Sequence, residues 1–197
     1  MKKKITLSLF FVFVFCGILA VQDTHSINYS QEEQLIVVGV GAFKDGFFDI
    51  AEKQFSQFTK QYPTHGKVHD IQYLLGKTLL LQGKLKEAKT AFLRIINENK
   101  NFESIDYTLF WLAQIEAKLG NAEEAKTFLL SIIKRFPKFE LIDYSYHLLG
   151  LLDLESNKVS SAETSLKRVS LLSKNNQLIR SSFFWLGILL FRKKDYE

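Results

Sequence analysis

The sequence predicts an all-α protein, a solenoid of antiparallel helix pairs that repeats every 37 residues. Three observations support this prediction. Small residues recur at this fixed step, apolar residues follow a helical period within each step, and Gly or Asn stands between successive apolar stripes. Sustained alternation of apolar and polar residues, the pattern of a half-buried strand, occurs nowhere in the chain. We therefore expect no β-sheet.

The chain begins with a predicted signal peptide over residues 1–20. Lys2–Lys4 precede an apolar run of 17 residues from Ile5 to Val21, and the small residue Ala20 lies near its end. We expect cleavage after Ala20 and a short linker over residues 21–31. The alternative is an uncleaved membrane anchor, because a run of 17 residues is at the lower limit for spanning a bilayer. Both predict export, to the periplasm or cell envelope if the host is a Gram-negative bacterium.

The chain has one cysteine, Cys16, which lies within this apolar run and follows Phe15. A bacterial lipoprotein signal requires a small residue before its cysteine, so we expect no lipid attachment. A mature chain without cysteine forms no disulfide and no thiolate metal site. The fold must therefore be held by its apolar core.

Residues 32–197 form the predicted repeat array. Two series of small residues have a step of 37: Ala51, Ala88, Ala125 and Ala162, and Gly39, Gly76, Ala113, Gly150 and Gly187. A third series with this step contains Gly46, Gly83, Gly120, Asn157 and Lys194. Glycine and asparagine most readily adopt the left-handed conformation that ends a helix. We divide the array into units of about 32–68, 69–105, 106–142 and 143–179, followed by an incomplete fifth unit, 180–197.

Each unit is predicted to contain a first helix (helix A), a tight turn and a second helix (helix B). In the third unit the two apolar stripes are Ile105, Leu109, Leu112 and Ile115, then Ala122, Ala125, Phe128, Leu129, Ile132 and Ile133. Pro63 and Pro137 end helix B at or before the residue that precedes them. The small residues are expected where two helices cross, with the large side chains of Phe55, Phe92 and Leu129 beside them.

In the fifth unit, helix A is expected over about Ile179 to Arg192, and Lys194 is expected to open helix B. Leu186, Leu189 and Leu190 would then have no partner helix. Because repeat arrays end in polar capping helices, we expect the encoded protein to continue with more repeats past Glu197.

The segment from Tyr73 to Ile96 resembles a tetratricopeptide repeat. That family has Leu-Gly in helix A, Gly at the turn, and Ala followed by an aromatic residue in helix B. Leu75-Gly76, Gly83, Ala88 and Phe92 carry this pattern here. The resemblance extends over residues 32–197, and it implies a right-handed α-solenoid that binds proteins and is not an enzyme. Because the usual step of the family is about 34 residues, the longer step here predicts a helix A that is about one turn longer.

Two further features make the chain similar to exported tetratricopeptide proteins of the bacterial envelope. An aromatic pair precedes Leu-Ala in Phe110-Trp111-Leu112-Ala113, and Arg135-Phe136-Pro137 closes the third unit. The most similar types are the periplasmic coordinator of the Tol–Pal system and the lipoprotein of the outer-membrane barrel-assembly machinery. The absence of a suitable lipid-attachment cysteine argues against the second type. This resemblance implies an interaction scaffold in the cell envelope.

The charge balance argues against a nucleic-acid partner. The net charge is +5, but Lys2–Lys4 belong to the predicted signal peptide, and without them 23 basic and 21 acidic residues leave only +2. So small an excess gives no extended basic surface. We expect a protein or peptide partner, no nucleic acid, and membrane contact only through an uncleaved signal anchor.

No arrangement of residues in the sequence indicates catalysis. Gly39-Val40-Gly41 lacks the Lys-Ser/Thr of a phosphate-binding loop, and the repeat already explains Gly39. His65 and His69 have the spacing of a metal pair, but no third ligand is evident, and a surface loop is the favoured interpretation. The acidic pairs Glu32-Glu33 and Glu123-Glu124 lie in first helical turns, where they stabilise the helix dipole. We expect no enzyme activity, no cofactor and no metal.

The candidate binding site is the concave face that helix A lines in the family. The contact positions of the family correspond here to Tyr73, Lys77, Tyr107, Phe110, Gln114, Tyr144, His147 and Phe184. Aromatic side chains with polar edges suit an apolar or extended segment of a partner protein. The family's chaperone-tail binders hold a terminal carboxylate with Lys and Asn, and only Lys77 is present for that role. For any single residue, simple packing between successive A helices is an equal alternative.

Three functions are compatible with this organisation. The favoured function is a non-catalytic scaffold for protein–protein interaction. The alternatives are a structural spacer or oligomerisation array, and a regulatory repeat region of a longer protein with a domain beyond residue 197.

Overall fold

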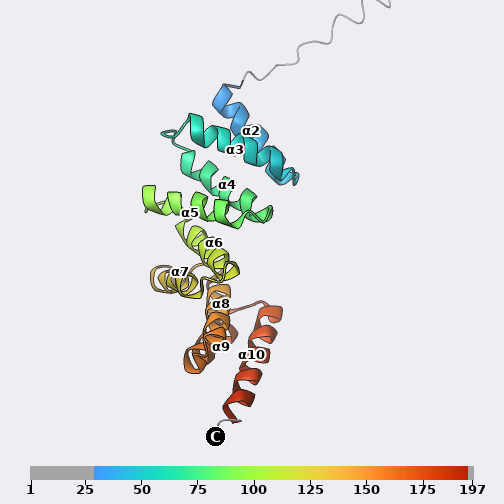
Figure 1. The fold of residues 1–197 in the computed structure, drawn as a ribbon, viewed down its shortest axis with the longest axis vertical. Coiled ribbons are helices and arrows are strands. Elements are labelled where there is room, and N and C mark those ends of the chain that lie inside the picture. Colours follow the sequence, from blue (N-terminus) through green and yellow to red (C-terminus); the bar gives the residue numbers. More distant parts are fainter. Residues whose placement is uncertain (1–28, 195–197) are drawn as a thin grey trace, which may run out of the picture.

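The computed structural model describes residues 29–194, which form nine α-helices and no strand. The first four are α2 (Gln31–Lys44), α3 (Phe48–Gln61), α4 (Val68–Leu81) and α5 (Leu85–Glu98), and the others are α6 (Ile105–Lys118), α7 (Ala122–Arg135), α8 (Ile142–Glu155), α9 (Val159–Leu172) and α10 (Asn176–Lys194). The helices stack in chain order into an elongated array with α2 and α10 at opposite ends (Figure 1). The predicted all-α solenoid is therefore confirmed.

The tight turns that join the helices of each pair form as the sequence predicts. Gly46, Gly83 and Gly120 have φ angles of 79°, 76° and 81°, and Asn157 takes the same left-handed region with φ 55°. Lys194 does not follow the series, because α10 continues through it. Lysine is a good helix former with no preference for positive φ, and Lys194 is the last residue of α10 here, so the expected opening of helix B falls on residues that the structure does not describe. Residues 195–197 lie outside the described part of the chain.

The connections between helix B and the next helix A account for the length of the repeat. Helices A and B have the same length, 14 residues each from α2 to α9, so the expected lengthening of helix A is not observed. The connections 62–67, 99–104 and 136–141 contain the additional residues. Each places a ring at its fourth position, and these residues, His65, Phe102 and Phe139, again differ by steps of 37. Phe102 and Phe139 are buried and pack on the preceding helix A, Phe102 against Tyr73 of α4 and Phe139 against Tyr107 of α6.

The small residues of helix A provide the space in which helix B packs. A Cβ atom on Gly39 would lie 2.6 Å from Cε1 of Phe55, and one on Gly76 would lie 2.7 Å from the same atom of Phe92. The large side chain comes 16 residues after the small one, and Leu166 meets Gly150 in the same way. These contacts confirm the expected helix crossings. Phe55, Phe92 and Leu166 are fully buried.

Helix α10 is covered on one side. Leu186 and Leu189 are buried against α9, so the expectation that they lack a partner helix is wrong for these two residues. Leu190 is exposed, and a Cβ atom on Gly187 would meet nothing within 4 Å. The side of α10 that contains Gly187 is thus open among the described residues.

The signal peptide predicted over residues 1–20 and most of the predicted linker lie outside the described residues. Among residues 29–194, none of the helices is both long enough and apolar enough to cross a bilayer.

We expect Gly39→Ala to destabilise the protein by about 1–3 kcal/mol, because the new methyl group overlaps the Phe55 ring. Gly41→Ala on the same helix is the matched control. A Cβ atom there meets nothing within 4 Å, so this change is expected to be neutral or stabilising by up to about 1 kcal/mol. Chemical denaturation followed by circular dichroism measures both. Equal effects of the two substitutions would contradict the packing role of Gly39.

Candidate functional site

A surface pocket of about 360 Å³ lies between α6 and α8, two successive A helices. We call it the α6–α8 pocket, and its lining residues are Phe110, Gln114, Ala117, Lys118, Tyr144, His147 and Leu148. Four of the eight residues predicted to contact a partner, namely Phe110, Gln114, Tyr144 and His147, are among them. The pocket therefore brings half of the predicted site together on two helices.

Phe110 contributes an apolar wall to the pocket. Its side chain is only 3% exposed, and its ring packs edge-on against Trp111 and Phe139, with ring centroids 5.6 and 6.0 Å apart. Phe110 thus packs between elements of the array, as the alternative interpretation allowed, and still lines the pocket. Phe139 belongs to the connection before α8, so this connection fixes the position of the Phe110 ring.

Two pocket residues on α8 form hydrogen bonds with α10 and with the residue that precedes it. The Asn175 side-chain amide donates to the Tyr144 hydroxyl at 2.7 Å, and Nε2 of His147 lies 3.0 Å from Oγ of Ser181. Burial lowers the pKa of His147 below its ordinary value of 6.5, so the imidazole is neutral at pH 7. These hydrogen bonds restrict the rotamers that the two side chains can adopt.

The polar groups of the α6 wall remain available. The side chains of Gln114 and Lys118 make no hydrogen bond or ion pair with another residue in the range 29–194. Gln114 offers one carbonyl acceptor and two N–H donors, and Lys118 offers an exposed ammonium group. Besides its apolar walls and the hydrogen-bonded Tyr144 and His147, the pocket therefore offers one uncharged polar side chain and one cation that make no such contact.

The predicted residues on α4 lie one repeat away and are engaged in packing. Trp111 Nε1 donates to the Tyr73 hydroxyl at 3.0 Å, and burial raises the pKa of Tyr73. The Lys77 ammonium lies 5.6 Å from the centre of the Phe43 ring and 5.7 Å from that of Tyr73, within cation–π range. The hydrogen bond joins α6 to α4, and the cation–π contact with Phe43 joins α4 to α2.

Tyr107 and Phe184 lie outside the α6–α8 pocket. The Tyr107 hydroxyl donates to the Glu140 carboxylate, which raises the pKa of Tyr107 to about 12. Phe184 is 63% exposed on α10, and its ring packs edge-on against Trp185 with centroids 5.4 Å apart. The structure thus divides the eight predicted residues among four places along the array.

Sequence reasoning missed three lining residues of the pocket: Ala117, Lys118 and Leu148. The signal that would identify Ala117 is a small residue at a repeat position where other units carry a larger one, namely Phe43, Leu80 and Leu154. Leu148 occupies the position of Trp111 and Trp185 in the two adjacent A helices, and α4 also carries a leucine there, Leu74. Comparing the units with one another thus adds lining residues that the family's contact positions do not include.

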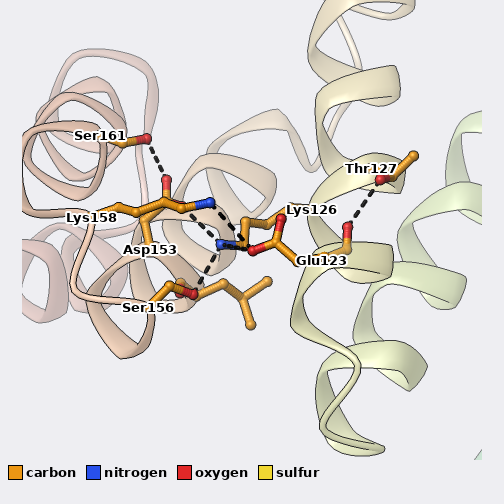
Figure 2. Close-up of polar contacts among 8 residues, drawn as sticks. Glu123, Lys126, Thr127, Asp153, Ser156, Lys158 and Ser161 are labelled. Atoms are coloured by element: carbon orange, nitrogen blue, oxygen red, sulfur yellow. Dashed lines mark hydrogen bonds and ion pairs between the residues drawn. The ribbon is translucent and has the colours of Figure 1, made fainter.

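A second polar cluster is buried where α7, α8 and α9 meet (Figure 2). The Lys126 ammonium lies 2.9 Å from Glu123, 3.2 Å from Asp153 and 3.0 Å from the Ser156 hydroxyl. The side chains of Lys126 and Asp153 are 6% and 4% exposed. A related pair joins α5 to α6, where Lys89 lies 2.6 Å from the buried Glu116. Ion pairs of this kind link one repeat to the next.

This cluster is suited to holding repeats together and not to proton transfer. Burial alone would lower the pKa of Lys126, but its hydrogen bonds to Glu123 and Asp153 outweigh burial and leave the pKa above the ordinary value. A lysine that stays protonated cannot remove a proton from the neighbouring Ser156 hydroxyl. Its ammonium group acts as a donor that satisfies two carboxylates.

The histidines that suggested a metal pair have other neighbours. His65 packs its ring edge-on against Phe58, with centroids 5.2 Å apart, and Nε2 of His69 lies 3.6 Å from Glu98. Over the described range 29–194, no three or more His, Cys, Asp or Glu side chains are grouped so that they could hold a metal ion.

Comparisons with known proteins agree with this geometry. Two family models described as tetratricopeptide repeat match residues 39–104 and 107–138. Among curated proteins, none matches the sequence significantly.

Solved structures share the fold at low sequence identity. A tetratricopeptide repeat protein from Parabacteroides merdae has a TM-score of 0.71 and 19% identity over 84% of this chain, which spans 61% of that protein. MamA from Desulfovibrio magneticus, residues 41 to the end, has a TM-score of 0.69 and 15% identity, covering 85% of this chain and 88% of that one. PilF from Pseudomonas aeruginosa has a TM-score of 0.64 and 17% identity, covering 84% and 70%. These similarities concern the fold.

The repeat period, the helix pairs and the structural neighbours define a helical repeat scaffold. The chain is a tetratricopeptide repeat protein. Such repeats generally mediate binding of protein partners and are generally non-catalytic. The matches do not support the more specific resemblance to the Tol–Pal coordinator or the barrel-assembly lipoprotein.

We expect Lys126→Met to destabilise the protein by about 3–5 kcal/mol, because Asp153 would stay buried without its cation. The double change Lys126→Met with Asp153→Leu is expected to recover most of this loss. Leucine already occupies the position of Asp153 in α4, as the buried Leu79. Lys158→Met, which removes an exposed ion pair with Glu123, is the control and is expected to cost less than about 1 kcal/mol. Denaturant titration compares the three; no recovery in the double variant would contradict this account of the cluster.

Proposed function

We propose that the chain is an interaction scaffold that binds an extended segment of a partner protein on its helix-A face. By helix-A face we mean the surface on which side chains of α4, α6 and α8 lie at the predicted contact positions. The observation that carries the proposal is the α6–α8 pocket, which unites Gln114, Tyr144 and His147 with the buried Phe110 wall. A pocket with apolar walls and a few convergent polar groups is typical of a binding site.

Preorganisation of the pocket supports this role. Tyr144 and His147 are already fixed by hydrogen bonds to Asn175 and Ser181, so binding costs little additional side-chain entropy. Gln114 has unused hydrogen-bonding capacity, and an extended peptide offers its backbone N–H and C=O groups to such a side chain. A spacer that only separates other modules has no need of an open pocket with unpaired polar groups.

We also propose that the protein is exported and acts in the cell envelope. The support is the basic start followed by the apolar run from Ile5 to Val21, which has the organisation of a secretion signal. Cleavage after Ala20 would leave the whole repeat array in the mature protein. The resemblance of Arg135-Phe136-Pro137 and of the aromatic pair in α6 to envelope repeat proteins agrees with this location.

We expect the double substitution Gln114→Ala with Tyr144→Ala to abolish specific capture of the partner, because it removes one polar side chain from each wall of the pocket. The matched control is Gln57→Ala with Leu130→Ala, which changes the same number of side chains on helix B; Leu130 is exposed on α7. Crosslinking followed by pull-down from an envelope extract measures capture, and circular dichroism verifies the fold. Capture that survives in the pocket variant, or that never occurs with the unaltered chain, would favour a spacer.

We expect the mature N-terminus to be Val21 when the full chain is expressed in its native host. Mass spectrometry of the protein from periplasmic and membrane fractions determines that terminus. A chain that keeps Met1 and stays in the membrane fraction would contradict cleavage and favour the uncleaved anchor. A chain that keeps Met1 in the cytoplasmic fraction would contradict export altogether.

A further inference from the structure

The spaces between successive A helices, which we call seams, differ in how they are filled. In the seam between α4 and α6 the filling side chain is the half-buried Trp111. Its indole N–H donates to the Tyr73 hydroxyl at 3.0 Å. Leu80, also in this seam, packs against the same core. A large aromatic ring and a branched aliphatic side chain are thus both packed against the core at this seam.

The seam between α6 and α8 lacks both of these side chains. One repeat step after Trp111 stands Leu148, and one step after Leu80 stands Ala117. The next seam, between α8 and α10, returns to the larger residues with Leu154 and Trp185. The α6–α8 pocket lies where the two bulky groups are missing, since Ala117 and Leu148 both line it. We therefore use the α4–α6 seam as a template: the side chains that fill it, an indole and a branched aliphatic group, indicate which groups fit the α6–α8 pocket.

From this template we propose that the α6–α8 pocket binds a large aromatic side chain, best an indole, that a partner protein supplies. The inference rests on the proposed function of the helix-A face and specifies its partner. Tyr73, which accepts the indole N–H of Trp111, corresponds to Phe110 in the next unit, so that acceptor is missing. Gln114 is the uncharged polar side chain of the pocket that has no partner among the described residues, and its amide oxygen supplies the acceptor.

Charge complementarity adds a second property of the partner. Lys118 is exposed at the pocket, and in the part of the chain that the structure describes it pairs with no carboxylate. An Asp or Glu next to the aromatic residue of the partner would pair with this ammonium group. The occupant is therefore an extended segment with an aromatic residue beside an acidic one.

The probe for this proposal is a synthetic 12-residue peptide with one Trp flanked by Glu residues, and the matched control peptide has Ala in place of Trp. We expect the Trp peptide to produce saturable NMR shifts at Gln114 and His147 of the full mature chain, and the Ala peptide to bind at least tenfold more weakly. In the chain, Leu148→Trp restores the side chain of the template and is expected to weaken binding at least tenfold while the protein stays folded. Ala117→Leu fills the other half of the pocket and tests the same point if Leu148→Trp disturbs the fold.

The variant Lys118→Glu tests whether the Lys118 charge contributes to binding. Its control is Lys138→Glu, which makes the same charge change on an exposed residue of the connection before α8. The first is expected to weaken binding of the acidic peptide severalfold, and the second is expected to leave it unchanged. Equal binding of the Trp and Ala peptides, or undiminished binding to folded Leu148→Trp, would overturn the proposal. A concentration-dependent dimer that Leu148→Trp abolishes would also overturn it, because the occupant would then be a second copy of the chain.

Failure of this proposal is distinguishable from failure of the proposed function. If Leu148→Trp still captures the natural partner but Gln114→Ala with Tyr144→Ala does not, the helix-A face binds its partner without an aromatic anchor. If both variants capture the partner as the unaltered chain does, the helix-A face is not the binding surface.

Discussion

The structure depends on a contact between a small residue of helix A and a large residue of helix B 16 positions later. At Gly39, Gly76 and Gly150 a Cβ atom would lie within 2.7 Å of the opposing side chain, so the helices of each pair can take only a narrow range of separations. Because every complete pair repeats the contact, the pairs have similar shapes and can stack regularly. Buried ion pairs such as Lys126 with Asp153 then join one pair to the next.

Because the units stack regularly, a residue that differs between units changes the local packing at one position only. When the backbone repeats, a smaller side chain at one position is not compensated by a movement of its helix, and it leaves a space of defined shape. The seam between α6 and α8 has Ala117 and Leu148 where neighbouring seams have a larger aliphatic residue and a tryptophan, and the pocket lies there. The same scaffold that makes the fold uniform thus allows a pocket to arise from one residue difference in each of two successive units. A fold shared by many proteins can in this way carry a pocket that other members lack.

The fold was more predictable from the sequence than the site. Helix period, turn glycines and small crossing residues are local features, and they predicted the helix pairs and the left-handed turns at Gly46, Gly83, Gly120 and Asn157. The connections were less predictable, because nothing local distinguishes a buried Phe102 from a helical one. The contact positions of the family included four residues that line the α6–α8 pocket, namely Phe110, Gln114, Tyr144 and His147. Those positions could not reveal that Trp111 packs between α4 and α6, because this packing depends on a hydrogen bond to Tyr73 in the preceding repeat.

The central claim is that partners bind at the α6–α8 pocket, and site-specific photo-crosslinking in the living cell tests it most directly. A photoreactive amino acid is placed at position 114 in the pocket, or at position 130 on the exposed side of α7, in otherwise unaltered full-length protein. The account predicts a discrete crosslinked partner from position 114 and none from position 130. A partner that crosslinks from position 130 and not from position 114 would place the binding surface on helix B and contradict the account.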